Sequence, residues 1–167
     1  LIYPKFESIA AFTRSTITDL RDTIWAMNKD EITFEDLKLR IINFIEAANA
    51  SLLGIHIEVN FVNKKEDLAL NSLQGIDVYR IIQEAVHNAI KHAQPQEIVV
   101  NFMQDANEVI VNIIDNGTGF DLKGLEKENS GNANVRTGNG LIYMQKRADE
   151  IQGKLSIIKH NPGTRVP

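Results

Sequence analysis

The residues with the clearest chemical content are Glu84 and Asn88, a carboxylate and an amide four positions apart. In a helix, residues at this spacing lie on one face. A divalent ion that bridges phosphate groups takes hard oxygen ligands and keeps most of its waters, so one neutral amide oxygen suits it. A carboxylate one turn away can accept a proton or orient a metal-bound water. The pair therefore indicates a metal ligand beside a general base, although the pair alone is more simply explained by a solvated helix face.

A second feature is the turn Asp115-Asn116-Gly117-Thr118-Gly119, which follows an apolar segment. A lone carboxylate at the end of an apolar strand is unexpected, because a buried charge without a partner is costly. An amino group of a ligand, such as the exocyclic amine of adenine, is a suitable partner. Gly117 and Gly119 permit positive φ and let a flat ring approach the backbone. The alternative is an ordinary hairpin turn of the Asp-Asn-Gly type.

The third feature is Gly138-Asn139-Gly140, which comes directly before a predicted helix. The first amide hydrogens of a helix have no partner within it, and glycines without a Cβ let phosphate oxygens reach them. A glycine-rich capping turn is the alternative. The stretch 121–137 is polar and has almost no apolar anchors, so it cannot order itself by burial. We interpret it as a lid over a triphosphate, although a loop without function has the same composition.

In this order and at these distances, the three features resemble the ATP-binding domain of the family that includes sensor histidine kinases, gyrase, heat-shock chaperones and mismatch-repair ATPases. The resemblance runs from about Leu70 to the C-terminus. Histidine kinases are the most similar of these relatives in two flanking stretches, Tyr79-Arg80-Ile81-Ile82-Gln83-Glu84 and Asn88-Ala89-Ile90-Lys91-His92-Ala93.

The resemblance implies a role for each of these residues, with ATP and Mg²⁺ as the bound species. Asn88 would be the Mg²⁺ ligand, Glu84 the base or positioning group, and Asp115 the acceptor for the adenine amino group. Lys91 and His92 match positions that approach phosphate oxygens. Thr164, in the terminal Gly-Thr element, would have a structural or phosphate-side role. The other implied nucleotide contacts are Gly117, Gly119, Gly138, Gly140 and Leu141.

The composition fits one globular domain with an appendage. The 167 residues are 43% hydrophobic and 24% charged, which is ordinary for a soluble protein. A net charge of −4 provides no basic footprint for nucleic acid. The absence of cysteine excludes disulfides and thiolate metal sites. No apolar run approaches the roughly 20 residues that span a bilayer.

Two helices are predicted in the N-terminal third. The first covers about residues 4–27, and its heptad-like seam consists of Ala10, Thr13, Ile17, Leu20, Ile24 and Met27. This seam is explained either by internal core packing or by the remainder of a dimerisation hairpin. The stretch 19–27 resembles the junction in histidine kinases that partner helix-turn-helix response regulators. The second helix begins after the N-cap Thr33, with Asp36 completing a capping box, and Gly54 is expected to end it.

Periodicity predicts the remaining elements. A strand covers 55–61, a long helix about 75–93, a hairpin of strands 97–103 and 108–115, and a third helix 140–151, with closing strands near 155–157 and 166. Helices and strands segregate instead of alternating strictly. We therefore expect an α/β (α+β) two-layer sandwich of mixed sheet and helices, the Bergerat fold of the resembling family, preceded by a helical segment.

No histidine of the chain resembles a phosphoacceptor. In the similar subgroup an acidic residue follows that histidine, whereas the four histidines here precede Ile57, Asn88, Ala93 and Asn161. We expect the acceptor on a segment upstream of residue 1 in a longer protein. Residues 1–30 are then the remainder of the dimerisation helix and its junction. Residues 31–167 are the ATP-binding catalytic domain, with its first helix at 33–53.

The expected function is binding of MgATP and transfer of the γ-phosphoryl group to a histidine, as the catalytic fragment of a two-component sensor kinase. The expected partners are the histidine-bearing dimerisation domain of the same protein, in a homodimer, and a response regulator receiver domain, without nucleic acid. We expect a cytoplasmic domain, with a membrane anchor elsewhere in the full-length protein left open. The alternatives are a GHKL ATPase of the gyrase, chaperone or mismatch-repair type, an anti-sigma-type serine kinase, and a nucleotide-sensing pseudokinase.

Overall fold

The computed structural model describes most of the chain outside the N-terminal segment and the predicted lid. The described residues are 9, 13, 16, 17, 20–25, 27–52, 54–63, 69–104, 108–118, 139–159 and 164–166.

A five-stranded sheet forms one layer of the molecule. Its order is β2 (His56–Asn63), β4 (Glu97–Gln104), β5 (Val109–Asp115), β7 (Thr164–Val166) and β6 (Ile158–Lys159). The β2–β4 pair is parallel and the other pairs are antiparallel. The predicted hairpin of β4 and β5 is therefore confirmed, and the sheet is mixed.

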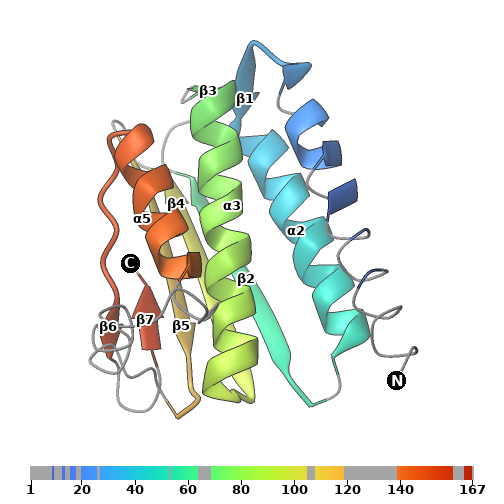
Figure 1. The fold of residues 1–167 in the computed structure, drawn as a ribbon, viewed down its shortest axis with the longest axis vertical. Helices are drawn as coiled ribbons and strands as arrows, with labels where there is room; N and C mark the ends of the chain where they lie inside the picture. The colour runs from blue at the N-terminus through green and yellow to red at the C-terminus, as the bar shows by residue number, and fades with distance from the viewer. Residues whose placement is uncertain are drawn as a thin grey trace.

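Helices form the second layer on one face of this sheet. They are α2 (Phe34–Ser51), α3 (Ser72–Asn88) and α5 (Asn139–Glu150), and α3 lies between the other two (Figure 1). A small antiparallel ribbon of β1 (Glu31–Thr33) and β3 (Ala69–Asn71) joins the helical layer at one end, and the sequence did not predict it. The expected two-layer α+β fold is confirmed.

The core lies between the two layers. The buried side chains of β4 alternate along the strand, as the period of two requires. They pack against the apolar stripes of the helices, and the fully buried members are Ile32, Leu37, Ile41, Ile82, Val86, Ile98, Val100 and Phe102. This packing fixes α3 above β4 and β5, where the predicted site residues lie.

The beginnings of α2 and α3 are both closed by capping boxes. The predicted box of Thr33 and Asp36 is present, and the end of α3 that faces β3 has a second one formed by Asn71 and Gln74. The expected start of α3 at Gly75 was therefore three residues late. Gly75 serves close packing, since a Cβ there would lie 2.4 Å from Cδ1 of Ile32.

The predicted helix end near Ala93 is confirmed, whereas the predicted end of α2 at Gly54 needed a correction. α3 passes at Ala89 into a π-helical turn, Ala89–Ala93, and the left-handed Gln94 with φ 49° closes it before Pro95. The chain leaves α2 at Leu52, which is already extended, so Gly54 follows the end of the helix and does not cap it. The π-helical turn carries the predicted site residues Lys91 and His92.

The described part of the N-terminal segment is helical at residues 9, 13, 16, 17, 20–25 and 27. Its predicted seam does not pack into the domain: Leu20, Ile24 and Met27 are exposed. The opposite side carries the buried Asp22 and the half-buried Trp25. The internal-packing explanation of the seam is therefore wrong for these three residues. Within the described residues, no helix has the length and apolar character to cross a membrane.

Candidate functional site

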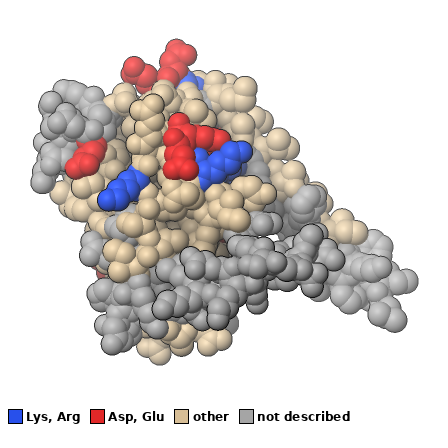
Figure 2. Space-filling view, turned by 60° about the vertical axis from the view of Figure 1, so that its left-hand side comes forward, with Lys and Arg blue, Asp and Glu red and all other residues tan. Residues whose placement is uncertain are grey.

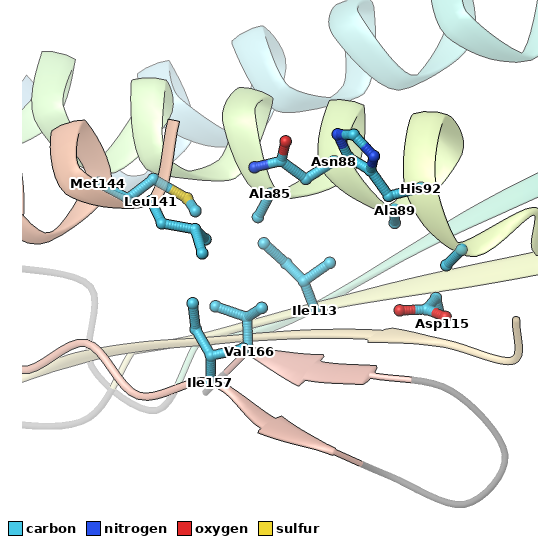
Figure 3. Close-up of a pocket in the computed structure, with 11 residues that line it drawn as sticks. Ala85, Asn88, Ala89, His92, Ile113, Asp115, Leu141, Met144, Ile157 and Val166 are labelled. Carbon is cyan, nitrogen blue, oxygen red and sulfur yellow. The ribbon is translucent and has the colours of Figure 1, made fainter. Parts of the chain in front are cut away.

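An apolar pocket lies between α3, α5 and the sheet. Its walls come from Ala85 and Ala89 on the helical side and from Ile113 and Val166 on the strands, and Figure 3 shows these side chains converging. The remaining lining residues are Asn88, His92, Ala93, Asp115, Leu141, Met144 and Ile157. The pocket is thus an apolar slot with a few polar groups at its edge, the usual character of a small-molecule site.

Among the described residues, Asp115 is the one carboxylate that lines this pocket. The residue is only 4% exposed and ends β5. Its Oδ1 accepts a hydrogen bond of 2.9 Å from the backbone N–H of Gly117. A carboxylate has about four acceptor positions, so it can accept from a ligand donor as well as from groups of the protein. Asp115 therefore lies at the end of an apolar strand, as the sequence predicted, and its role as an acceptor for a ligand stays a prediction.

The turn after β5 is held tightly against the end of the π-helical turn. The N–H of Thr118 donates to the carbonyl oxygen of Ala93 at 2.8 Å. A Cβ at Gly117 would lie 2.2 Å from that same oxygen, so only glycine fits without moving the backbone. Gly117 therefore serves the close approach of two backbone segments beside Asp115.

Asn116 supports the site in a way that sequence reasoning missed. Its side-chain Oδ1 accepts hydrogen bonds of 3.0 Å from the N–H groups of both Gln96 and Glu97. These two amides lie at the start of β4. The only available signal was the tendency of asparagine to bond nearby backbone groups in turns, and it gave no indication of the partner segment.

Glu84 and Asn88 face the first turn of α5. A Cβ added at Gly140 would lie 2.0 Å from Oε1 of Glu84 and 3.5 Å from Nδ2 of Asn88. Both side chains are partly exposed. The fold thus brings together a carboxylate, an amide and a helix N-terminus from segments about fifty residues apart, as their spacing and order predicted. The site residue Leu141 follows directly and lines the pocket.

A partly buried ion pair fixes α5 against α3, and nothing in the sequence indicated it. Nη1 of Arg147 donates to Oδ1 of Asp77 at 2.6 Å, and the Asp77 side chain is 2% exposed. Asp77 lies two helical turns before Glu84 on the same side of α3, but this spacing gives no indication of its partner on α5. Elsewhere on α5, Lys146 and Glu150 are 3.9 Å apart, and acidic and basic side chains lie next to one another on this side of the molecule (Figure 2).

The other predicted site residues fall into three groups. His92 lines the pocket, whereas Lys91 is exposed and does not line it. Thr164 begins β7, but its side chain is not described. Gly119, Gly138 and the stretch 121–137 lie outside the described residues. Within the described part of the chain, no three His, Cys, Asp or Glu side chains form a cluster able to hold a metal.

Comparisons with known proteins agree on one family. A family model described as histidine kinase-, DNA gyrase B- and HSP90-like ATPase matches residues 74–166. The signal transduction histidine-protein kinase/phosphatase DegS of Bacillus subtilis (strain 168) is 36% identical over 104 residues, which cover 62% of this chain and 25% of DegS. The oxygen sensor histidine kinase NreB of Staphylococcus carnosus (strain TM300) is 34% identical over 116 residues, which cover 68% of this chain and 30% of NreB.

Solved structures agree with this result at the level of the fold. The catalytic domain of histidine kinase ThkA has a TM-score of 0.59 at 20% identity and covers 81% of this chain and 91% of its own. The Acinetobacter baumannii histidine kinase AdeS has a TM-score of 0.59 at 12% identity and covers 94% of this chain and 77% of its own. The chain spans only 25% to 30% of the length of DegS and NreB.

Proposed function

The chain belongs to the family of histidine kinase-, DNA gyrase B- and HSP90-like ATPases, and we propose that it is the ATP-binding catalytic domain of a two-component sensor histidine kinase. The observation that carries the proposal is the pairing of two features on one side of α3. Asp115 sits at the edge of an apolar pocket, and Glu84 and Asn88 face the first turn of α5. The similarity to DegS and NreB supports a histidine as the acceptor.

The lining of the apolar pocket suits the chemistry of adenine. The aliphatic side chains of Ile113, Leu141 and Met144 would cover its faces. The Asp115 carboxylate would accept a hydrogen bond from the exocyclic amino group. Guanine presents a carbonyl oxygen at the corresponding position, so the same carboxylate would repel it. The pocket therefore selects adenine by a charged hydrogen bond that guanine cannot make.

The triphosphate would extend from this pocket toward the first turn of α5. Amide hydrogens at a helix N-terminus favour phosphate oxygens, and Gly140 keeps their approach open. His92 also lines the pocket and would meet the phosphate chain. Exposed Lys91 would contribute charge from the surface.

The residues present fit a magnesium ion that is held mainly by phosphate oxygens. The Asn88 amide carries a hard oxygen ligand, and its Nδ2 would lie 3.5 Å from a Cβ at Gly140 in the first turn of α5. The described residues form no acidic metal cluster, so the protein would supply few ligands to the ion. When bound, Mg²⁺ would neutralise charge on the β- and γ-phosphates.

Glu84 would act on the nucleophile. Its carboxylate lies beside Gly140 and can accept a proton from, or orient, the group that attacks the γ-phosphoryl group. We place the acceptor histidine on a dimerisation domain of the same protein. The exposed stripe of Leu20, Ile24 and Met27 would pack in that domain, with a second copy of the protein. A response regulator receiver domain on the cytoplasmic side would then take the phosphoryl group.

A nucleotide titration with Asp115→Asn tests this proposal. The wild type should bind MgATP more tightly than MgGTP. Loss of a charged hydrogen bond costs about 1.5–3 kcal/mol, so the variant should bind ATP roughly ten- to a hundredfold more weakly. Asp30→Asn makes the same change at an exposed position and should leave both affinities unchanged. Equal affinity of the wild type for ATP and GTP would contradict the assignment of the pocket.

A second measurement tests the acceptor. The full-length protein, incubated with labelled ATP, should carry an acid-labile and base-stable phosphoryl group. Hydrolysis of ATP without any phosphoprotein would instead identify an ATPase of the gyrase or chaperone type. An acid-stable phosphoprotein would identify a serine kinase.

A further inference from the structure

A buried carboxylate joins the N-terminal helical segment to both neighbouring helices. Asp22 is 2% exposed. Its Oδ1 accepts a hydrogen bond from Nη2 of Arg40 on α2, and its Oδ2 lies 3.2 Å from Nη1 of Arg80 on α3. One acidic group is thus shared by two guanidinium groups that come from different helices. Such an arrangement is specific in geometry, because a buried charge requires its partners.

Further side chains extend this contact in two directions. The guanidinium carbon of Arg40 lies 4.5 Å from the ring centroid of Trp25 and 5.2 Å from that of Tyr79. The Tyr79 hydroxyl accepts a hydrogen bond of 3.0 Å from Nε2 of Gln83, and Oε1 of Gln83 accepts one of 3.3 Å from Arg80. We call Asp22, Trp25, Arg40, Tyr79, Arg80 and Gln83 the Asp22 cluster. Its last member is the chain neighbour of Glu84.

The helical segment has two opposite faces. Asp22 and Trp25 point toward the domain, while Leu20, Ile24 and Met27 are 58%, 56% and 78% exposed. At 3.6 residues per turn these two sets lie on opposite sides of the helix. The segment can therefore keep its contact with the domain while its exposed stripe packs elsewhere.

The segment also forms part of the groove in which Glu84 lies. Thr23 lines this groove together with Glu84 and His87 from α3 and with Tyr143 and Arg147 from α5. The helical segment therefore leaves the domain beside the groove that contains Glu84.

We propose that Asp22 is a positioning residue for phosphoryl transfer, which holds the upstream helix at one fixed orientation to the nucleotide site. This inference rests on the proposed function. An acceptor carried by that helix then meets the γ-phosphoryl group at a defined place. Loss of the cluster leaves the nucleotide site intact but lets the two parts move relative to one another, and transfer between loosely oriented groups is slow.

The test uses the full-length protein with Asp22→Asn, and Asp30→Asn as the matched exposed control. Nucleotide affinity is measured by titration and the transfer rate by single turnover from saturating MgATP. Asp22→Asn should keep the ATP affinity within about twofold and lower the transfer rate about tenfold or more. The control should change neither. Hydrogen exchange should become faster at residues 20–27 of the variant while β4 stays protected.

A milder variant keeps the test decisive if Asp22→Asn folds poorly. Arg40→Lys retains a positive charge but loses the planar fork and the stacking on Trp25. Arg40→Lys should also lower the transfer rate, but by a smaller factor than Asp22→Asn, and it should leave the ATP affinity unchanged.

Three results would overturn the inference. They are an unchanged transfer rate despite faster exchange at 20–27, a faster transfer rate, and a parallel loss of ATP affinity and transfer. Failure of the wild type to form any phosphohistidine would instead refute the proposed function, so the two failures are distinguishable.

Discussion

Replacing Gly140 with alanine tests whether the Glu84 carboxylate acts from its observed position. The added Cβ would lie 2.0 Å from Oε1 of Glu84, whereas ordinary contact begins near 3.4 Å. The carboxylate oxygen must therefore move by about 1.4 Å, the difference between these two distances. Because that oxygen ends a flexible side chain, the movement costs little folding free energy. Alanine also favours a helix by about 0.5–1 kcal/mol over glycine.

Stability and transfer should therefore respond differently in this variant. We expect Gly140→Ala to have an unfolding free energy equal to or slightly above that of the wild type. A displacement of about 1 Å at a reacting group costs on the order of 10²-fold in rate, so single-turnover transfer at saturating MgATP should fall by about that factor. Gly153→Ala is the control, because its nearest contact would be an ordinary 3.4 Å to the carbonyl oxygen of Ala148.

A double-mutant cycle decides whether the loss passes through Glu84. If Gly140→Ala acts only by displacing this carboxylate, it should add almost nothing to the effect of Glu84→Gln. Fully additive losses would mean that the new methyl group disturbs phosphate binding directly. A wild-type transfer rate in Gly140→Ala would refute the proposed role of the carboxylate position altogether.

Three further expectations concern binding, acid and alkali. Glu84→Gln should keep the ATP affinity and lose about 10²-fold in transfer, while Asn88→Ala should lose the Mg²⁺-dependent part of the affinity, as titrations with and without Mg²⁺ will measure. The hydrogen bond from Lys29 lowers the pKa of the Asp36 carboxyl below its ordinary value of 3.8, so the stability that this carboxylate contributes is present above that pH and is lost as the pH falls through the lower pKa of the folded state. In denaturation experiments, the free energy of unfolding of Asp36→Asn should be about 1 kcal/mol below that of the wild type at pH 7. It should also change less with pH in acid. Burial, together with the Asp22 carboxylate, raises the pKa of Tyr79 from 10.0 to about 12. The stability that the neutral hydroxyl contributes is therefore complete below pH 10 and is lost as the pH rises to 12. Tyr79→Phe should reduce this loss of unfolding free energy in alkali.

The sequence was sufficient wherever one short segment determines the outcome. Helical spacing placed Glu84 and Asn88 on one face, and alternation placed Asp115 at the end of a buried strand. The Thr33 capping box followed from two residue types at the right distance. These features depend on local geometry, which the residue order specifies directly.

Contacts between distant segments were beyond such reasoning. Asp77 and Arg147 pair across 70 positions, and Asp22 finds two arginines on separate helices. Each looked like an ordinary charged residue of a solvated helix, because only the packing of the helices makes them neighbours. Gly75 was taken for a helix start for the same reason, since its partner Ile32 lies on a ribbon that the sequence pattern did not reveal.

The bonds made by Asn116 have a consequence for inhibitor chemistry. They fasten the end of β5 to the start of β4, while Thr118 fastens it to Ala93. The part of the pocket that would contact the base, which we call its floor, is thereby ordered by hydrogen bonds to backbone groups even without a bound nucleotide. A ligand then loses little free energy in ordering the protein around it. We expect fragments that carry only the donor and acceptor pattern of adenine to bind with high ligand efficiency, and selectivity among related kinases to come from groups that extend beyond this floor.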